Sequence, residues 1–198
     1  MKTRLAILVF SLVISCTNSR KKDRYEIYNT VLREKISTYG ILHQYISFRN
    51  NQSEKEMTLE AERISDSLKN SKSLTYFLDQ RFTILDTTNL SDDFYEGKGD
   101  NLVIQFKPQY SKENIDFSKI QGVEFAKRID HSKAIDENGK QTYLGNYELS
   151  EPFFIAENKA LIRYQHHCGS KCGLGILIYM EKVNDKWKIT DEKMIWIS

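Results

Sequence analysis

The chain has no excess of charge of one sign. Its 198 residues include 29 Lys and Arg against 27 Asp and Glu, which gives a formal net charge of +2. A nucleic-acid-binding domain normally carries a basic patch or stripe that attracts phosphates. The balance therefore argues against a nucleic-acid partner.

The chain also lacks the short motifs that mark common catalytic sites. It contains no G-x-S-x-G, no Walker loop, no H-E-x-x-H and no Rossmann glycine pattern. The acidic segment 92–100 lacks the ordered ligand spacing of an EF-hand loop, which favours a solvated loop over a calcium site. We assign no catalytic residue, cofactor or metal, and the sequence favours a protein that is not an enzyme.

Long apolar runs are absent except near the start of the chain. The first fifteen residues, MKTRLAILVFSLVIS, combine two basic residues, an apolar run from Leu5 to Ile14 and the small residue Ser15. This layout is typical of a secretory signal peptide, and the run is too short for a permanent membrane-spanning helix. No other segment is apolar over a length that would cross a bilayer.

The junction VISC at residues 13–16 resembles the lipobox of bacterial lipoproteins, in which a small residue precedes the cysteine. The resemblance implies that residues 1–15 are a lipoprotein signal peptide and that Cys16 becomes lipidated. The membrane is then a partner through the lipid anchor on Cys16. An ordinary secretory signal followed by a chance cysteine is the alternative.

The resemblance also predicts where the protein lies. Residues 16–23 are the lipidated cysteine and a polar tether, followed by a single domain at residues 24–198. Thr17 stands where aspartate commonly retains such lipoproteins in the inner membrane. This favours the outer membrane of the cell envelope, facing the periplasm. Removal of residues 1–15 takes away Lys2 and Arg4, so the mature chain carries no net charge.

The domain is predicted to begin with helices and to continue with strands. Helical spacing of apolar residues appears between Asp23 and Gly40, after the capping-box pair Ser53 and Glu56, and again after Ser73 in Leu74, Phe77, Leu78 and Phe82. Strand patterns follow at residues 101–107, 123–129, 142–149 and 153–157, with a hairpin turn at Asn138-Gly139.

This order predicts an α+β fold in which N-terminal helices pack on one face of a mainly antiparallel β-sheet. An NTF2-like or a cystatin-like arrangement fits this description. The segment 39–48 fits either a strand or a continued helix.

The last residues predict two hairpins with a defined register. If Cys168 faces Cys172, then Ile162 faces Ile178, and one face of the sheet becomes apolar throughout. A second turn at Asn184-Asp185 places Trp187 and Ile189 on that same apolar face. Arg163, Gln165 and His167 lie on the opposite face, because side chains alternate along a strand.

The cysteine hairpin, HHCGSKCGLG, has three interpretations. Facing residues of an antiparallel pair lie at Cα distances that suit a disulfide between Cys168 and Cys172, and export favours its oxidation. A metal site would combine both cysteines with His166 alone, since His167 lies on the other face. A thioredoxin-like redox site requires a two-residue spacing at a helix start, whereas the spacing here is three. We predict the disulfide.

The C-terminal segments SEPFF, NKALIRY, HCGSKCGLGILIYMEK, KWKI and WIS resemble the C-terminal signature of a group of lipoproteins common in Bacteroidetes. The shared features are a Cys-Gly…Cys-Gly hairpin and a terminal Trp-Ile-Ser, and they cover roughly residues 149–198. The resemblance implies a cell-envelope location and the hairpin fold. It implies no activity.

Two functions follow from these observations. The first is a non-enzymatic binding module of the cell envelope with a protein or glycan partner. The alternative is a small-molecule-binding or hydrolase-like domain that uses a polar pocket around Arg163, Gln165, His167 and Tyr179. Gly173 and Gly175 face His167 and Gln165, and strand glycines permit close approach of another group.

Overall fold

The computed structural model describes residues 2–38, 42, 53–85, 109–130, 142–169 and 172–198, with residues 2–18 described by their backbone alone. No helix in these ranges is long and apolar enough to cross a bilayer. Four features predicted from the sequence lie outside the described residues. They are the strand at 101–107, the turn Asn138-Gly139, the acidic segment 92–100 and most of the segment 39–48.

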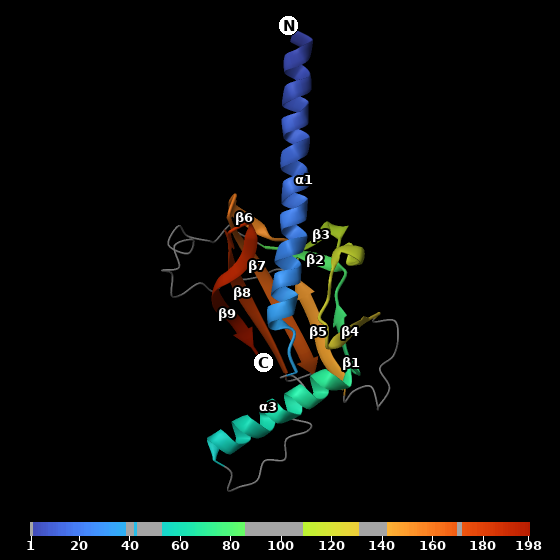
Figure 1. The fold of residues 1–198 in the computed structure, drawn as a ribbon, viewed down its shortest axis with the longest axis vertical. Helices are drawn as coiled ribbons and strands as arrows, with labels where there is room; N and C mark the ends of the chain where they lie inside the picture. The colour runs from blue at the N-terminus through green and yellow to red at the C-terminus, as the bar shows by residue number, and fades with distance from the viewer. Residues whose placement is uncertain (1, 39–41, 43–52, 86–108, 131–141, 170–171) are drawn as a thin grey trace.

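The domain is built on one mixed sheet that is mainly antiparallel (Figure 1). Its strands are β1 (Leu74–Leu78), β4 (Ala126–Ile129), β5 (Tyr143–Leu149), β6 (Phe153–Ala156), β7 (Lys159–Gly169), β8 (Cys172–Val183) and β9 (Lys186–Ile197). They lie in the order β4-β1-β5-β7-β8-β9, with β6 also paired to β7. Only β1 pairs in parallel, with β4 and β5. A small second sheet joins β2 (Arg81–Ile84) to β3 (Gln109–Asn114), and the 3-10 turn η1 (Phe117–Lys119) follows.

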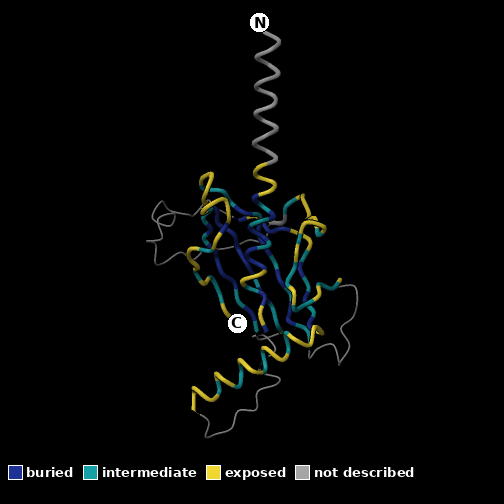
Figure 2. Tube along the Cα trace, in the orientation of Figure 1, coloured by how far each residue is buried: buried dark blue, intermediate teal, exposed yellow. Residues whose placement is uncertain are grey.

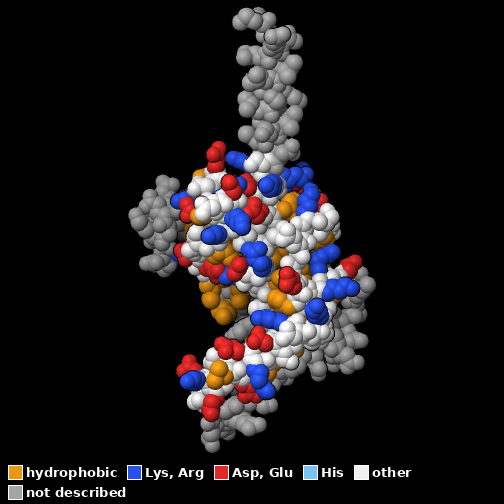
Figure 3. Space-filling view, viewed as in Figure 1, with side chains coloured by type: hydrophobic (Ala, Val, Ile, Leu, Met, Phe, Trp, Pro, Cys, Tyr) orange, Lys and Arg blue, Asp and Glu red, His pale blue; other side chains and the backbone are white. Residues whose placement is uncertain are grey.

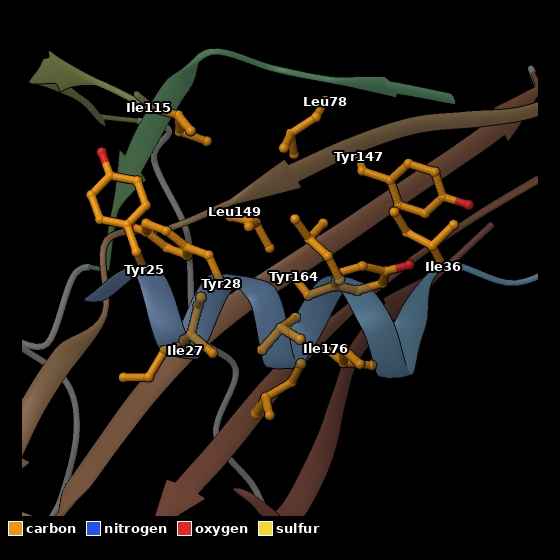
Figure 4. Close-up of a cluster of buried hydrophobic side chains, with 14 of the residues drawn as sticks. Tyr25, Ile27, Tyr28, Ile36, Leu78, Ile115, Tyr147, Leu149, Tyr164 and Ile176 are labelled. Atoms are coloured by element: carbon orange, nitrogen blue, oxygen red, sulfur yellow. The ribbon is translucent and has the colours of Figure 1, made fainter. Parts of the chain in front are cut away.

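Helix α1 (Lys2–Lys35) covers one face of the sheet with its C-terminal half, while its N-terminal half extends away from the domain (Figure 1). Ile27, Tyr28, Val31 and Leu32 are fully buried, as expected for one helical face. Figure 4 shows side chains of α1 pointing at those of β5 and β7. The buried residues in Figure 2 are concentrated where α1 crosses the sheet, which is where the main core lies.

Polar contacts fix α1 to the last strands at both ends of the contact. The Asp23 carboxylate accepts hydrogen bonds from Lys182 Nζ at 2.7 Å and from Trp187 Nε1 at 3.1 Å. At the other end, Lys35 pairs with Glu192, and the Tyr164 hydroxyl donates to the Lys35 carbonyl at 3.2 Å. Residues 16–23, the segment interpreted above as a tether, are part of this continuous helix. Asp23, the last residue of that segment, is buried.

The second helix, α3 (Glu54–Ser71), begins with the predicted capping box. Ser53 Oγ accepts from the Glu56 amide, and the Glu56 carboxylate accepts from the Ser53 amide at 2.8 Å. This helix has no fully buried residue, and only Leu68 packs against the main core among its described apolar side chains. It lies at the far end of the sheet from the projecting half of α1, so α1 is the helix that covers this face among the described residues (Figure 1).

The helix predicted after Ser73 is wrong, because Leu74–Leu78 and Arg81–Ile84 form strands β1 and β2. Lys72 takes the left-handed conformation at the end of α3, with φ 52°, and stops the helix there. Leu74, Tyr76 and Leu78 then alternate inward, which is the period of a strand.

The predicted C-terminal hairpins are confirmed. Ile162 pairs with Ile178, and His166 pairs with Leu174. Asn184 and Asp185 form the two-residue turn with φ of 52° and 58°, and Trp187 is buried. The α+β fold class is likewise confirmed, with two described helices and a sheet that is mostly antiparallel.

Candidate functional site

The face of the sheet opposite α1 carries a row of paired, mostly polar residues that crosses three strands. Phe77 of β1 pairs with Asn146 of β5, and Asn146 pairs with His167 of β7. Two residues along, Glu148 pairs with Gln165. Paired residues lie on the same side of a sheet, so these side chains form one continuous surface.

A cleft of about 960 Å³ opens on this surface beside His167. Its lining comes from the end of β1 and the turn to β2, from the end of β4, from η1, and from β5 and β7. The described lining residues are Phe77, Leu78, Asp79, Gln80, Arg81, Phe117, Arg128, Asp130, Asn146, Glu148 and His167. They combine three carboxylates, two guanidinium groups, an imidazole, two amides and two aromatic rings.

Contacts within the cleft hold several of these groups in place. Arg81 donates to both oxygens of Asp79, at 3.2 Å from Nε and 2.9 Å from Nη2. The guanidinium of Arg128 lies 3.7 Å from the centre of the Phe117 ring. The Tyr143 hydroxyl donates to the Asn146 side chain, and burial raises the pKa of Tyr143 to about 12. A polar ligand would meet oriented donors and acceptors here, whereas the described lining holds no hydroxyl or thiol nucleophile.

The four residues predicted to form a pocket do not all line this cleft. His167 lines the cleft, but Arg163, Gln165 and Tyr179 are not among its described lining residues. Arg163 is only 3% exposed, and Tyr179 packs beside a small second apolar cluster of Leu85, Leu161 and Leu177. Burial and then the Asp191 carboxylate raise the pKa of Tyr179 to about 12.

Sequence reasoning missed most of the cleft. Asp79 and Gln80 form the turn between β1 and β2, and Arg81 begins β2, in the segment predicted as a third helix; Arg128 belongs to an edge strand. The parallel pairing of β1 with β4 and β5 joins segments far apart in the chain. A local signal for this pairing is absent from the sequence.

The strand glycines beside His167 accommodate a side chain of the same protein. Gly175 pairs with Trp196, and a Cβ atom on Gly175 would lie 2.1 Å from Trp196 Nε1. A Cβ on Gly173 would lie 3.0 Å from the same ring, which also lies 5.1 Å from the His167 ring between centres. The side chain that closely approaches these glycines is therefore Trp196, and its ring packs beside the His167 ring.

Replacement of Gly175 by alanine is expected to displace the Trp196 ring and to cost about 1–2 kcal/mol of stability. Tryptophan fluorescence should shift to longer wavelength, because Trp196 becomes more exposed while the only other tryptophan, Trp187, stays buried. In the Trp196→Ala background the same Gly175→Ala change should cost much less. An equal cost in both backgrounds would contradict the contact.

The neighbouring His166 belongs to the core on the other face. Its ring stacks on Tyr147 with centres 4.4 Å apart, and Nε2 lies 2.8 Å from the Leu144 carbonyl oxygen, so Nε2 carries the proton. Burial lowers the pKa of His166, the Leu144 hydrogen bond opposes this shift, and the nearby His167 adds to it. The ring is thus engaged within the core rather than facing the cysteines.

Stability is therefore expected to fall as the pH falls below about 6.5, the ordinary pKa of histidine in the unfolded chain. Between the lowered pKa of folded His166 and that value, the unfolded state binds more protons than the folded state. Urea unfolding at pH 7.5, 6.5 and 5.5 measures the slope. The slope should be smaller in His166→Gln than in the wild type, and equal slopes in the two proteins would count against this assignment.

The cysteine hairpin lies at the end of the sheet remote from the projecting half of α1. Cys168 and Cys172 lie at disulfide distance, with 5.1 Å between their Cα atoms. The strand register shifts after His167, so that Gly169 rather than Cys168 pairs with Cys172. The pair is nevertheless compatible with the predicted disulfide.

An apolar patch lies at the same end, on the α1 side of the sheet beyond the end of that helix. We define this distal patch as Leu174, Met194 and Ile197, which share a face because Leu174 pairs with Ile197 and Met194 with the adjacent Ile176. Met194 is 61% exposed and Ile197 is 71% exposed. Figure 3 shows a group of hydrophobic side chains at the C-terminal end of β9.

The distal patch adjoins an edge of the main sheet. Strand β9 ends the strand order, and within the described ranges no strand pairs with its outer side. An edge with exposed apolar side chains can accept a further strand, since its outward N–H and C=O groups are available.

No protein family, curated protein or solved structure matches this chain. The resemblance to Bacteroidetes lipoproteins accordingly stays a prediction from sequence motifs. The functional conclusion rests on the geometry of the cleft, of the distal patch and of the helix that precedes the domain.

Proposed function

We propose that this protein is a lipid-anchored lipoprotein of the bacterial cell envelope and a non-enzymatic binding module for a protein partner. The supporting observation is the distal patch beside the outer edge of β9. Such exposed apolar groups are typical of interaction sites when they lie together. The lipobox-like VISC supplies the anchor at Cys16 in this proposal.

The partner adds an extended segment to β9. Its main chain pairs with the outer side of β9, and its apolar side chains cover Met194 and Ile197. In this mode of recognition, main-chain hydrogen bonds give affinity and the side-chain contacts give specificity. Glu192 is held by Lys35, so the strand beside the patch is already ordered before a partner binds.

The positions of α1 and of the distal patch at opposite ends of the domain suit a protein that is anchored through its N-terminus. The helix that follows Cys16 enters the domain at the end opposite the distal patch (Figure 1). With Cys16 lipidated in the outer membrane, the patch points into the periplasm. Oxidation of Cys168 and Cys172 in that compartment would fix the end of the β7–β8 hairpin beside it. For the fold we propose an NTF2-like or cystatin-like arrangement, which the long helix across a mainly antiparallel sheet would suit.

Photo-crosslinking in intact envelopes tests the binding site. A photoreactive residue placed at Met194 or at Ile197 is expected to give one discrete adduct, identified by mass, and a charged Met194→Lys variant should lose the partner in reciprocal capture. Amides of β9 should also exchange hydrogen more slowly when the purified partner is added. This last result distinguishes strand addition from a contact made by side chains alone.

Leu59 on α3 offers a matched control, since it is an exposed apolar residue with 56% exposure outside the distal patch. A crosslink from position 59 that equals those from 194 and 197 would mean non-specific capture. The absence of any adduct at 194 and 197 would overturn the proposal. An adduct between two copies of the chain would show that the distal patch binds a second copy of this protein, which would also overturn the proposal of a different partner.

The cleft supports a second candidate function, binding of a glycan or a small polar ligand. Its 960 Å³ volume and its mixture of charged, amide and aromatic groups suit such a ligand. Titration with glycans of the envelope should change Trp196 fluorescence, because that ring lies beside His167. The change should be weaker in Glu148→Gln, and hydrolysis of an added ligand would favour the hydrolase-like alternative.

A further inference from the structure

A second cavity, of about 760 Å³, lies where α1 enters the domain. Its walls are one turn of α1, strand β6 and the turns after β6 and β8. Arg20 and Asp23 come from α1, Phe154 from β6, Lys182 from β8, and Glu157 and Asp185 from the two turns. The cavity therefore brings together segments that are far apart in the sequence.

The floor of this cavity is fixed by the bonds that attach α1 to the domain. Asp23 is 7% exposed and accepts hydrogen bonds from Lys182 and Trp187. The Lys182 ammonium and the Asp23 carboxylate form an ion pair at 2.7 Å. This end of the cavity is therefore held by contacts of the buried Asp23.

The rim of the cavity carries charges of both signs that are exposed. The Arg20 guanidinium lies 5.8 Å from the centre of the Phe154 ring, at the helix side of the opening. Glu157 and Asp185 are exposed in the turns across from it. Figure 3 shows acidic and basic side chains intermixed around the point where α1 leaves the domain. Besides the Lys182–Asp23 ion pair, the lining thus exposes one cationic and two anionic side chains, which suits a zwitterionic ligand.

The short distance between Cys16 and the cavity indicates which zwitterionic ligand would lie near it. Asp23 follows Cys16 by seven residues of continuous helix, a rise of about 10 Å. The polar headgroup region of a bilayer leaflet is roughly 5–8 Å thick. A lipid on Cys16 would therefore hold the rim of the cavity against the headgroups, because the helix between Cys16 and Asp23 fixes the distance between them.

We propose that this cavity binds a phospholipid headgroup that carries a phosphate and a primary ammonium, supplied by the bilayer in which Cys16 is anchored. The phosphate meets Arg20, the ammonium meets Glu157 and Asp185, and the glycerol end contacts Phe154. This inference rests on the proposed lipid anchor. In this arrangement the cavity is a second attachment to the membrane besides the lipid on Cys16. The two attachments together make the distal patch point away from the membrane.

Hydrogen exchange of the full lipidated protein in vesicles tests the contact. The peptides that contain residues 157–158 and 184–185 should exchange at least fivefold more slowly in phosphatidylethanolamine vesicles than in detergent. The slowing should be smaller in phosphatidylcholine, whose ammonium has no N–H to donate, and in phosphatidylglycerol, which has no ammonium. Arg20→Gln and the pair Glu157→Gln with Asp185→Asn should each remove most of the difference.

Glu62→Gln is the matched control, because Glu62 is an exposed carboxylate on α3 at the opposite end of the domain. It should leave the exchange of both turns unchanged. The mass of the same preparation separates the two possible failures. A lipid on Cys16 without slower exchange of the turns overturns the headgroup site and leaves the anchor intact. A mature chain without that lipid overturns both.

Discussion

Replacement of Gly145 by alanine is expected to lower the free energy of unfolding by about 4 kcal/mol. Gly145 has φ +121°, a conformation that side chains with a Cβ rarely adopt, and such strain costs about 1–3 kcal/mol. The added Cβ would also lie 2.6 Å from both the His167 carbonyl oxygen and His166 Nε2. The carbonyl belongs to a paired backbone, so neither group moves away easily.

The reason for this glycine is the irregular pairing of β5. Thr75 pairs with Tyr143 and Phe77 with Asn146, so β5 has one extra residue between these pairs. This bulge brings the Leu144 carbonyl to the His166 ring and carries Asn146 to the cleft. Loss of the bulge would disturb the core and the cleft together.

Urea unfolding of Gly145→Ala measures the effect. Gly169→Ala is the matched control, because the nearest atom to its added Cβ is Cys172 Cβ at 4.0 Å, and its cost should stay below about 1 kcal/mol. Gly145→Ala within 1 kcal/mol of the wild type would show that the strand conformation of β5 is wrong.

Replacement of Leu32 by alanine is expected to cost about 3 kcal/mol. Leu32 has no exposed surface and lies in the middle of the α1 contact with the sheet. The change removes one methine and two methyl groups from such a site and leaves a cavity, and the measured range for this change is about 2–5 kcal/mol. The thermal midpoint of a domain of this size should fall by roughly 6–12 °C.

Arg33→Ala provides the comparison for that change, because Arg33 is the next residue on the same helix and is exposed. Its ion pair with Glu34 is a surface contact at 3.6 Å, so the loss should stay below about 0.5 kcal/mol. Similar losses in the two variants would mean that α1 does not pack on the sheet as described.

The C-terminal half of the fold could be predicted from local patterns. The alternation of apolar residues in β7 and β8, together with Asn184-Asp185 at the turn, leaves one register that keeps a single apolar face. The capping box of α3 is equally local, since Ser53 and Glu56 are three residues apart. Each of these signals lies within a few residues of the structure that it specifies.

The segment after Ser73 could not be assigned in this way, because its apolar residues satisfy two periods at once. Leu74, Phe77, Leu78 and Phe82 fit one face of a helix, whereas Leu74, Tyr76 and Leu78 fit one face of a strand. The choice is made by the parallel neighbours β4 and β5, which come more than 40 residues later in the chain.

The cleft and the position of Trp196 were beyond prediction for a related reason. The pairing of β9 with β8 shifts register twice, between Tyr179 and Met180 of β8 and again between Gly175 and Ile176. These shifts place Trp196 of β9 over the glycines of β8. A bulge changes which residues face each other without a clear mark in the sequence. The glycines were identified as sites of close approach, but the group that approaches them was not.

The mass of the N-terminal peptide, from protein extracted out of native membranes, tests the central claim most directly. The proposal of a lipid-anchored module predicts a mature chain that begins at Cys16 and carries a thioether-linked diacylglycerol on that residue. A chain that retains residues 1–15, or one that begins elsewhere with an unmodified Cys16 thiol, would contradict it.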